Sequence, residues 1–570
     1  MSQKVKLTTI FLGITLLAVP LAVSAVSLSQ QSNFFVDSSY DLYGRKEISA
    51  TLEKITNQVY FYVDTTWWDK LDYSKKMEIG KKLYDLSDEF ERKIYPILTS
   101  TFGSEWKPGI DKDERITILI HPMKKEAGGY FNSGDVYFKL QYPRSNQREM
   151  VYLNSQHIDK PEAKSLLAHE FTHLITVNQK DLLRNVTEEV WLNEARAEYA
   201  PTLLGYDDIY KGSNLERRVK AFLEKPNDSL TEWRNEKEDY GAINLFTQYL
   251  VDYYGKKILV DSLQSSKVGI PSINEALTKN GFKEDFSQIF TDWTISVLVN
   301  DCNLGEKYCY KNENLKNLKI VPESSFLSTA IESSLSVYSR IKDWSARWQR
   351  LFGGKGGLTF KFSGREGVKF KVPYVLCDYA NNCSVKFFNL DEQQKGEVII
   401  PEFTSKYSSL TLIPSVQNKL SGFTDNEPTY LFSWDVRIKE VSRDDPELVK
   451  KLLAQIASLK AEIARLQAQI NTILGKEQTQ VSCLRFESNL YYGMRDNSEV
   501  GCLQEFLKNQ GQEIYPEGLV TGNFLILTKT AVIRFQEKYN SEILKPLGLE
   551  RGTGYVGPAT RIKINHLLGF

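Results

Sequence analysis

The sequence predicts a multidomain chain in which an α+β domain is followed by an all-β, sandwich-like module, a coiled-coil helix and a small α-helical domain. Three observations support this prediction. The chain has 570 residues, which is too many for one hydrophobic core. Its residue pattern changes near residue 340 from mixed strand and helix periods to short alternating strands. A heptad repeat then precedes a last helical block.

Composition limits the classes of partner that the protein can have. Hydrophobic residues make up 41% of the chain and charged residues 25%, as in ordinary globular proteins. Lys and Arg total 72 and so do Asp and Glu, so the formal net charge is zero. A chain that binds nucleic acid needs a surplus of positive charge on some face. We therefore expect no nucleic-acid partner.

The first residues have the pattern of an export signal. Lys4 and Lys6 precede an apolar stretch at 7–23, and small residues allow cleavage after Ala25. The alternative is an uncleaved membrane anchor, for which the apolar stretch is borderline in length. Residues 1–25 are thus predicted to be a signal peptide, and the protein to be secreted or associated with the cell envelope.

The cysteine pattern agrees with export. An even number of cysteines in close pairs is typical of short-loop disulfides formed in an oxidising compartment. A zinc knuckle is the alternative, but the sequence contains no CxxC and no His near any pair. The expected disulfides join Cys302 to Cys309, Cys377 to Cys383, and Cys483 to Cys502.

The first domain is predicted to occupy residues 26–335. Residues 59–63, 115–120 and 150–153 have the apolar composition of strands. Residues 74–97 have a helical period, and helical signals dominate the second half of the domain. The domain should therefore combine a sheet with several helices.

One helix of this domain has the residues for metal chemistry. Asp159 is expected to cap a helix over residues 161–178, which contains His169, Glu170 and His173. Residues four apart lie on one helix face, so both imidazoles can bind a single Zn²⁺ ion, one per chain. Zinc lowers the pKa of a bound water toward about 7, and Glu170 can accept its proton. Two surface His on an amphipathic helix are the alternative.

A third metal ligand is expected on a second helix. Glu194 supplies a carboxylate and, with two imidazoles, leaves the fourth tetrahedral position open for water. Glu188 and Glu189 are the competing ligands, or else a solvated pair that caps the helix. Glu198, one turn after Glu194, could accept the outer N–H of either imidazole, and Asn193 is a second residue predicted for this outer role.

These motifs resemble those of the gluzincin metallopeptidases, the group that includes thermolysin. HEFTH at 169–173 and WLNEARAEY at 191–199 carry the resemblance. More narrowly, GGYFNSGDVY, SNQREMVYLN and DYGAINLFTQYLVDYYG are similar to segments of the hyicolysin-like branch, and the resemblance covers residues 45–300. It implies a zincin-type α+β peptidase fold, a catalytic zinc and a protein or peptide substrate. It also implies an edge strand beside the zinc helix that holds substrate by β-augmentation, for which residues 150–153 are expected. Ala195 stands where the family often has Gly, which removes no ligand.

The resemblance also directs attention to the group that stabilises the oxyanion. Thermolysin-like enzymes use a downstream His, but no His occurs between His173 and His566. Tyr240 is the expected donor, because related peptidases place a Tyr in such a segment. The alternative is a core aromatic at the start of a helix. His121 and His157 are predicted to be structural.

Residues 340–442 are predicted to form the all-β module. Apolar and polar residues alternate at 359–362 and 368–372, and short strand-like segments continue at 385–388 and 398–400. Several short strands separated by turns are most simply a β-sandwich. The sequence assigns no function to this module.

Residues 446–475 carry the heptad repeat. Its core positions are Val449, Ile456, Ile463 and Ile470 in one series and Leu452, Leu459, Leu466 and Ile473 in the other. β-Branched residues at the first core position and mainly Leu at the second favour a parallel coiled-coil homodimer. A single amphipathic helix packed on a neighbouring domain is the alternative.

Residues 480–570 resemble the peptidoglycan-binding domain of cell-wall enzymes. SEVGCLQEFL, TGNFLILTKTAV and GTGYVGPATRIK carry the resemblance, and the last two are similar halves. The resemblance implies a three-helix fold that binds peptidoglycan. Leu525 and Ile526 replace a common Gly-Pro, which affects the contacts of the loop rather than the fold. A helical dimerisation or docking module is the alternative.

Together these features predict an exported zinc-dependent endopeptidase that hydrolyses peptide bonds through a metal-activated water and is tethered to the cell wall. One alternative is a wall-anchored binding or adhesion protein with a degenerate peptidase fold. Another is a peptidase that acts on peptidoglycan cross-links. Metal content and sensitivity to a chelator separate the first alternative from an enzyme.

Overall fold

The structure is a computed structural model that describes residues 27–330, 332–439, 463, 465–466 and 485–570. The chain divides into two compact units, Met1–Asp445 and Pro446–Phe570. The predicted signal peptide at 1–25 lies outside the described residues. So do Cys483 and all but three residues of the heptad segment.

The first unit begins with a sheet whose parallel strands are buried. The strand order is β1 (Gln31–Phe35), β2 (Glu47–Ile55), β3 (Val59–Asp64), β4 (Ile116–His121), β6 (Met150–Asn154) and β5 (Gly129–Tyr130). β3, β4 and β6 run parallel, and the other pairs are antiparallel. Every residue of these three parallel strands is buried, as expected when both faces of a sheet are covered. The strands predicted at 59–63, 115–120 and 150–153 are confirmed.

The edge of this sheet differs from the expectation. Residues 150–153 are predicted as the edge strand, but β6 lies between β4 and β5. Gly129 and Tyr130 of β5 pair with Leu153 and Tyr152, so β5 is the edge. The prediction is wrong because a strand of two residues has no period that a sequence can display.

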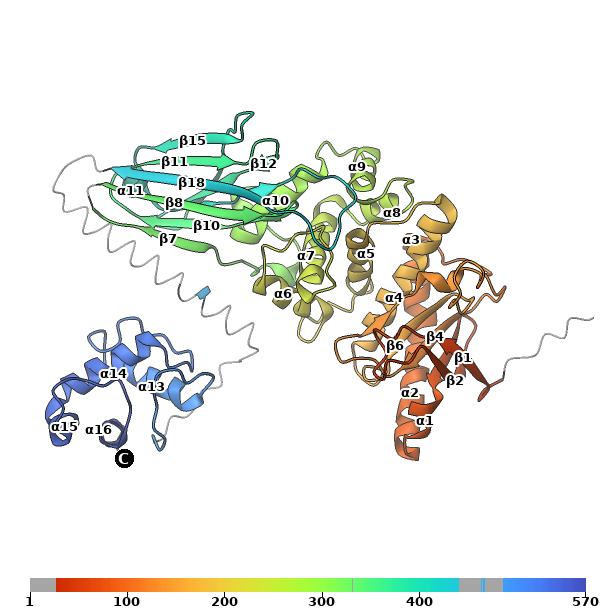
Figure 1. Cartoon of the computed structure of the whole chain (residues 1–570), viewed down its shortest axis with the longest axis horizontal. Helices are drawn as coiled ribbons and strands as arrows, with labels where there is room; N and C mark the ends of the chain where they lie inside the picture. Colours follow the sequence, from red (N-terminus) through yellow and green to blue (C-terminus); the bar gives the residue numbers. More distant parts are fainter. Residues whose placement is uncertain (1–26, 331, 440–462, 464, 467–484) are drawn as a thin grey trace, which may run out of the picture. The chain divides into compact units, whose positions relative to one another are not determined.

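Helices make up most of the rest of the first unit. α2 (Tyr73–Glu89), the π-helical turn η1 (Phe90–Ile94) and α3 (Tyr95–Phe102) form a continuous stretch where a helix over 74–97 is predicted. The other helices are α1 (Thr65–Asp69), α4 (Ala163–Val177), α5 (Val190–Leu203), α6 (Asn214–Glu224), α7 (Lys237–Tyr254), α8 (Lys257–Leu263), α9 (Gly269–Lys279) and α10 (Phe286–Val299). Short helical turns are η2 (Ser133–Val136), η3 (Asn178–Leu182), η4 (Cys302–Leu304) and η5 (Glu313–Leu315). α4 packs against both β6 and α5 (Figure 1).

The start of α4 also differs from the expectation. The helix begins at Ala163, and the preceding Glu162 makes no side-chain capping hydrogen bond. Asp159, the predicted cap, instead lies 3.1 Å from the ammonium of Lys75. The prediction of Asp159 as cap is wrong because the chain between Asp159 and Ala163 forms turns rather than the first turn of the helix.

A strand-rich region follows, in which two sheets share one core. One sheet has the order β14 (Cys383–Phe387), β13 (Pro373–Asp378), β16 (Tyr407–Leu412), β10 (Gln349–Gly353) and β7 (Glu323–Leu327). The other has the order β15 (Lys395–Ile400), β11 (Gly357–Gly364), β18 (Tyr430–Lys439) and β8 (Glu332–Ile341). Shorter elements are β9 (Ser345–Ala346), β12 (Phe370–Lys371), β17 (Ser415–Val416) and α11 (Phe403–Lys406). Leu376 and Leu410 of the first sheet share a buried cluster with Phe360 and Trp434 of the second. This arrangement is compatible with a sandwich-like module (Figure 1).

The strand-rich region holds the segment that leads into α7. The N–H of Leu230 donates to the Trp344 carbonyl at 2.8 Å. Lys342 forms an ion pair with Glu232, whose side chain is buried. These contacts come from beyond residue 340 and fix the path of the chain just before it reaches the candidate site.

The second unit has its own core and a repeated turn. Its helices are α13 (Ser498–Asn509), α14 (Ile526–Lys538), α15 (Asn540–Ile543), η6 (Lys545–Leu547) and α16 (Pro558–Leu567). Gln504 Oε1 accepts the N–H of Thr521 at 2.6 Å, and Gln536 Oε1 accepts the N–H of Thr553 at 2.8 Å. Each residue of the second pair lies 32 positions after its counterpart. The similar halves in the sequence therefore form similar turns.

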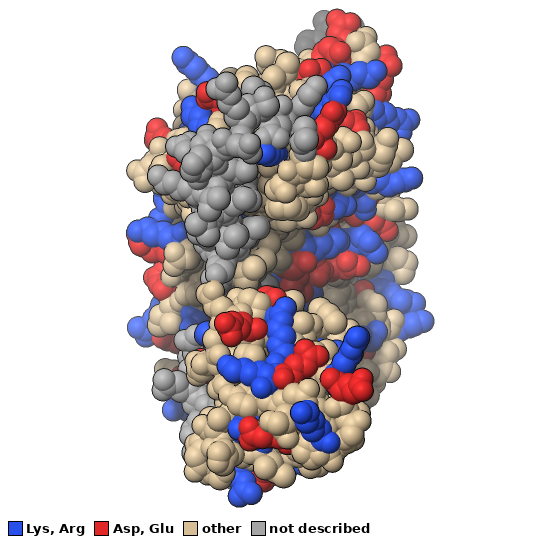
Figure 2. Space-filling model, turned by 90° about the vertical axis from the view of Figure 1, so that its left-hand side faces the viewer, with Lys and Arg blue, Asp and Glu red and all other residues tan. Residues whose placement is uncertain are grey.

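Two of the expected disulfides, Cys302–Cys309 and Cys377–Cys383, are confirmed. Positive and negative side chains are interspersed over the face of the molecule shown in Figure 2. In the part of the chain that the structure describes, no helix has the length and apolar character needed to cross a membrane.

Candidate metal centre

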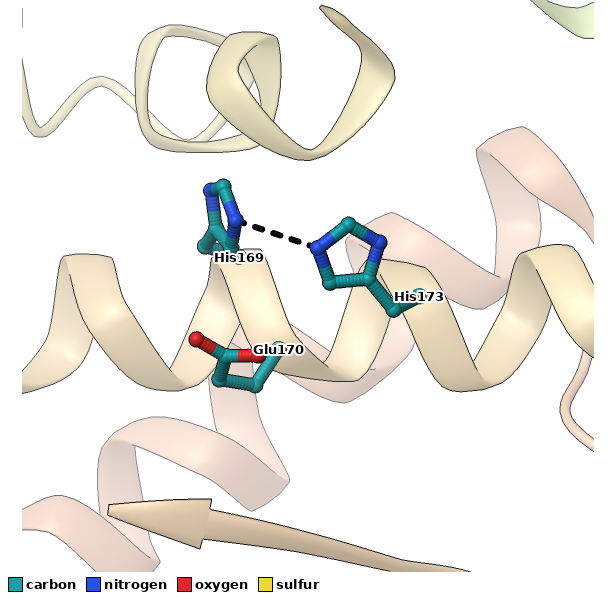
Figure 3. Close-up of side chains that lie close together, drawn as sticks. All are labelled: His169, Glu170 and His173. Carbon is teal, nitrogen blue, oxygen red and sulfur yellow. Dashed lines mark hydrogen bonds between the residues drawn. The ribbon is translucent and has the colours of Figure 1, made fainter. Parts of the chain in front are cut away.

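Two helices bring the candidate ligands together. α4 places His169 and His173 one turn apart on the same face. α5, which packs against α4, contributes Glu194. Figure 3 shows the two imidazole rings turned toward each other beside α4, with the Glu170 side chain lying apart from them.

The three ligand atoms lie close to one another. His169 Nε2 and His173 Nε2 are 3.1 Å apart. Glu194 Oε2 lies 3.2 Å from the first nitrogen and 3.6 Å from the second. This oxygen is buried and has no well-aligned hydrogen-bond donor among the described residues. Two ring nitrogens and one carboxylate oxygen therefore converge on one point.

These separations fit a tetrahedral zinc ion. Zinc binds imidazole nitrogen and carboxylate oxygen at about 2.0–2.2 Å, so neighbouring ligand atoms of a tetrahedron lie about 3.3–3.6 Å apart. The observed distances of 3.1, 3.2 and 3.6 Å are close to or within that range. Three protein ligands with a fourth position left for water are the arrangement of catalytic rather than structural zinc sites.

The Nδ1 atom of each imidazole ring lies near a hydrogen-bond acceptor. His169 Nδ1 lies 3.4 Å from Glu198 Oε1, and His173 Nδ1 lies 3.1 Å from Asn193 Oδ1. Both acceptors favour a proton on Nδ1, which leaves the Nε2 lone pair of each ring for a metal. Glu198 and Asn193 are thus placed to orient the two imidazoles without binding the metal themselves.

Arg218 of α6 supports this outer shell. Its Nε and Nη2 donate to Glu198 at 2.7 and 2.6 Å, and Asn214 donates to the same carboxylate at 2.9 Å. Burial works to raise the pKa of Glu198, but the charge of Arg218 holds it well below its usual range. Nothing in the sequence singles out Arg218, because its partner lies on another helix at no regular spacing.

The electrostatic field of the site favours a cation. Burial lowers the pKa of His169, but contacts with Glu194 and Glu198 raise it to about 10. Burial raises the pKa of Glu194, but the charge of His173 and contacts with both imidazoles lower it to about 2. Two ionised carboxylates therefore face the imidazoles at neutral pH. A divalent metal ion that suits imidazole and carboxylate ligands fits this field.

Glu170 is a further carboxylate near the imidazoles. One ligand atom from each of Glu170, His169 and His173 lies within 4.8 Å of the others. Glu194 Oε2 lies within 3.6 Å of both imidazoles, whereas Figure 3 shows the Glu170 side chain apart from them, so Glu194 is the better-placed third ligand. Glu170 lies against β5 instead, where a Cβ on Gly129 would come 3.0 Å from its Oε1. Burial raises the pKa of Glu170, which suits a group that accepts a proton from a metal-bound water.

The competing ligands are engaged elsewhere. Glu188 pairs with Arg196 at 2.7 Å and accepts the N–H of Gly269 at 2.7 Å. Glu189 accepts the indole N–H of Trp191 at 2.7 Å. Neither carboxylate is therefore placed to share a metal with the two imidazoles.

Tyr240 lies beside the first imidazole. Its ring centroid is 6.5 Å from that of His169, and its hydroxyl donates to Asn235 Oδ1 at 2.7 Å. Burial and then the charge of Glu194 raise the pKa of Tyr240 far above its usual value. The phenol therefore stays protonated and can act as a hydrogen-bond donor.

The remaining His residues of this domain contact other carboxylates. His121 Nδ1 lies 3.2 Å from Asp41, and both side chains are fully buried. His157 Nδ1 lies 3.1 Å from Glu162 at the start of α4. These contacts agree with a structural role for both.

A cavity of about 620 Å³ opens beside the two helices. Residues from the sheet, from α4 and from the start of α7 line it, including Tyr40, Gly129, His169, Glu170, Asn235 and Tyr240. The cavity gives a substrate access to His169 and to Glu170.

Asn193→Ala is expected to weaken zinc binding by about 10–100-fold, because it removes the acceptor that orients His173. Competition with a fluorescent zinc chelator would measure the affinity. Asn193 is only half-buried, so the melting temperature of the zinc-free protein should stay close to that of the wild type. Unchanged zinc affinity would contradict an orienting role for Asn193.

One comparison supports a relationship to metallopeptidases. The chain is 27% identical over 227 residues to the neutral metalloprotease ShpI of Staphylococcus hyicus. The match covers 35% of this chain and 49% of that protein, so the chain spans about half the length of the relative. The relationship is distant, and it agrees with a metal site formed by His and Glu side chains.

The other comparisons add no argument. No family model matches the chain. Among solved structures, PliG of Aeromonas hydrophila, a periplasmic inhibitor of g-type lysozyme, matches at 7% identity with a TM-score of 0.15. That match covers 21% of this chain and 100% of the other. A TM-score this low supports no conclusion about fold or function.

Proposed function

We propose that this chain is an exported zinc-dependent endopeptidase that acts on a protein or peptide substrate. The observation that carries the proposal is the approach of His169 Nε2, His173 Nε2 and Glu194 Oε2 to within 3.1–3.6 Å of one another. Such a set binds zinc and leaves one coordination position open. The similarity to a neutral metalloprotease supports the same proposal.

The neighbouring residues have the chemistry that peptide hydrolysis needs. When bound, zinc lowers the pKa of a water molecule toward about 7 and polarises a carbonyl group. Glu170 would accept a proton from the attacking water and deliver it to the leaving amine. Tyr240 donates a hydrogen bond to the oxyanion that forms on the attacked carbonyl. β5, at the sheet edge beside Glu170, offers main-chain groups to an extended peptide.

The parts of the chain outside the peptidase domain would determine where the protein acts. We propose that residues 1–25 direct export, that residues 446–475 form a dimer, and that residues 480–570 bind peptidoglycan. The support for the last is the family resemblance together with the repeated Gln–Thr turn. A dimer would bring two wall-binding domains to one surface and so raise the overall affinity.

Metal removal is the direct test. The purified protein should contain about one zinc per chain and digest fluorescently labelled casein. 1,10-Phenanthroline should abolish the digestion, and added zinc should restore it. If the purified protein contains no zinc and the chelator does not change its binding to cell walls, it is instead a wall-anchored binding protein with a degenerate site.

The same preparation separates general proteolysis from cleavage of cross-links. Casein digestion supports the proposed endopeptidase. Release of soluble fragments from purified peptidoglycan without casein digestion would assign the cross-link peptides as the substrate. Mass spectrometry of the product ends would identify the bonds that are cut.

A further inference from the structure

Tyr40, on the loop between β1 and β2, lines the same cavity as His169, Glu170 and Tyr240. Its carbonyl accepts the N–H of Lys124 at 2.9 Å, and its own N–H donates to the Asp37 carbonyl at 3.1 Å. The adjacent Asp41 is fully buried and pairs with Arg45 at 2.8 Å. The backbone that presents Tyr40 is therefore well anchored to the sheet.

Aromatic stacking fixes the direction of the Tyr40 ring. The ring stacks on Tyr130 with centroids 4.8 Å apart and planes at 13°. Tyr130 in turn stacks on Tyr152 at 4.1 Å and 10°. Tyr130 directly follows Gly129, the residue against which Glu170 lies. The stack therefore places Tyr40 at the part of the sheet edge that faces Glu170.

Asn235 lines the same cavity as the two tyrosines. Tyr240 donates to Asn235 Oδ1 at 2.7 Å. Burial raises the pKa of Tyr40, and a hydrogen-bonding interaction with the Asn235 side chain opposes that rise. Asn235 has a φ of +61°, a left-handed conformation that Asn tolerates better than most residues. Burial and then the negative charges of nearby carboxylates, Glu170 and Glu194 among them, raise the pKa of both phenols, and both phenols line the cavity with Glu170.

The Asn235 side chain ends in a carboxamide, the same functional group as a peptide bond. Its oxygen accepts from Tyr240, as a peptide carbonyl would, and its amide is available to Tyr40, as a peptide N–H would be. Two phenols thus interact with one carboxamide in the cavity that His169 and Glu170 also line. A backbone amide of an extended substrate can make the same two contacts when Asn235 withdraws.

We propose that Tyr40 is a substrate-binding residue that, together with Tyr240, holds a backbone amide of the substrate at the position where the structure shows the Asn235 side chain. This inference rests on the proposed peptidase function. It assigns Tyr40 to binding of the ground-state amide, whereas Tyr240 also serves the oxyanion. Loss of the Tyr40 hydroxyl therefore raises KM rather than lowering kcat.

Tyr40→Phe tests the proposal, because Phe keeps the stack on Tyr130 and removes only the hydroxyl. The substrate is an internally quenched peptide built on a casein site that the wild-type protein cleaves. KM should rise roughly 3–15-fold, as for the loss of one hydrogen bond, with kcat within about twofold of wild type. Zinc content and melting temperature should not change. Tyr43→Phe is the matched control, since Tyr43 is exposed on the same loop and does not line the cavity.

Asn235→Ala shows whether Tyr40 contacts the substrate directly or acts on it only through Asn235. In that background, Tyr40→Phe should still raise KM by the same factor if Tyr40 touches the substrate. An unchanged KM in Tyr40→Phe, or an effect that disappears in the Asn235→Ala background, would overturn the proposal. Failure of the underlying peptidase proposal is distinguishable, because the wild-type protein itself would then show no chelator-sensitive cleavage.

Discussion

Glu170→Gln is expected to lower kcat/KM by about 10²–10⁴-fold, the usual contribution of a general base, while zinc remains bound. The substitution keeps the size and shape of the side chain but removes its charge and its ability to accept a proton. Glu170 is farther from the imidazoles than Glu194 is, so the ligand set should stay intact. Casein digestion and metal analysis of the same sample measure both consequences.

Glu162→Gln is the matched control for this experiment. Glu162 lies just before α4, but it contacts His157 rather than the candidate ligands. Its substitution should leave both proteolysis and zinc content near the wild-type values. Two results for Glu170→Gln would contradict the proposed role. Full activity would exclude Glu170 as the base, and loss of zinc would make it a ligand.

The positions of the two His and Glu170 follow directly from the sequence, because the spacing within one helix fixes them. His169 and His173 must share a face wherever that helix lies. The approach of Glu194 was also predictable, since a carboxylate on a following helix with a same-face partner in Glu198 is a recognisable pattern. The distances that make the set fit zinc depend on how α4 and α5 pack, and no sequence period encodes them.

Other residues of the site have no such local signal. Tyr40 lies far from α4 in the sequence and reaches the cavity only because β1 and β2 pair and place their loop there. Asn235 reaches it because the strand-rich region holds the segment that precedes α7, through contacts such as that of Leu230 with Trp344. Both positions result from long-range packing. A single sequence shows the helical motif but not the other residues that line the cavity.

The same reasoning explains the error at the sheet edge. β5 has only two residues, so its pairing with β6 leaves no alternation to detect. Gly128 and Gly129 are visible in the sequence as a glycine pair. The reason for a glycine at position 129 is visible only in the fold, where a Cβ on Gly129 would come within 2.6 Å of the Tyr152 carbonyl oxygen. A close approach of backbone to backbone requires glycine there.

Glu194→Gln is expected to abolish proteolysis and to weaken zinc binding by more than the roughly 100-fold that outer-shell changes reach. The carboxamide keeps the shape of the side chain but replaces an anionic ligand by a weaker neutral one. The buried Glu194 Oε2 lies within 3.6 Å of both imidazole nitrogens and has no well-aligned donor among the described residues, which suits a metal ligand. Metal analysis after dialysis against a weak chelator would measure the loss, and added zinc at high concentration should restore part of the activity.

Glu189→Gln is the control that decides which carboxylate binds the metal, Glu194 within α5 or Glu189 just before it. Glu189 Oε2 accepts the indole N–H of Trp191 at 2.7 Å and Oε1 accepts the N–H of Gly422 at 2.8 Å. A glutamine oxygen can keep one of these bonds, and neither donor is a candidate metal ligand. Zinc affinity should therefore be unchanged in Glu189→Gln. The reverse pattern, with zinc retained in Glu194→Gln and lost in Glu189→Gln, would require Glu189 to leave those two donors and the start of α5 to turn toward α4. The packing of α5 against α4 would then differ from that described here, and the case for a zinc site formed by these two helices would fail with it.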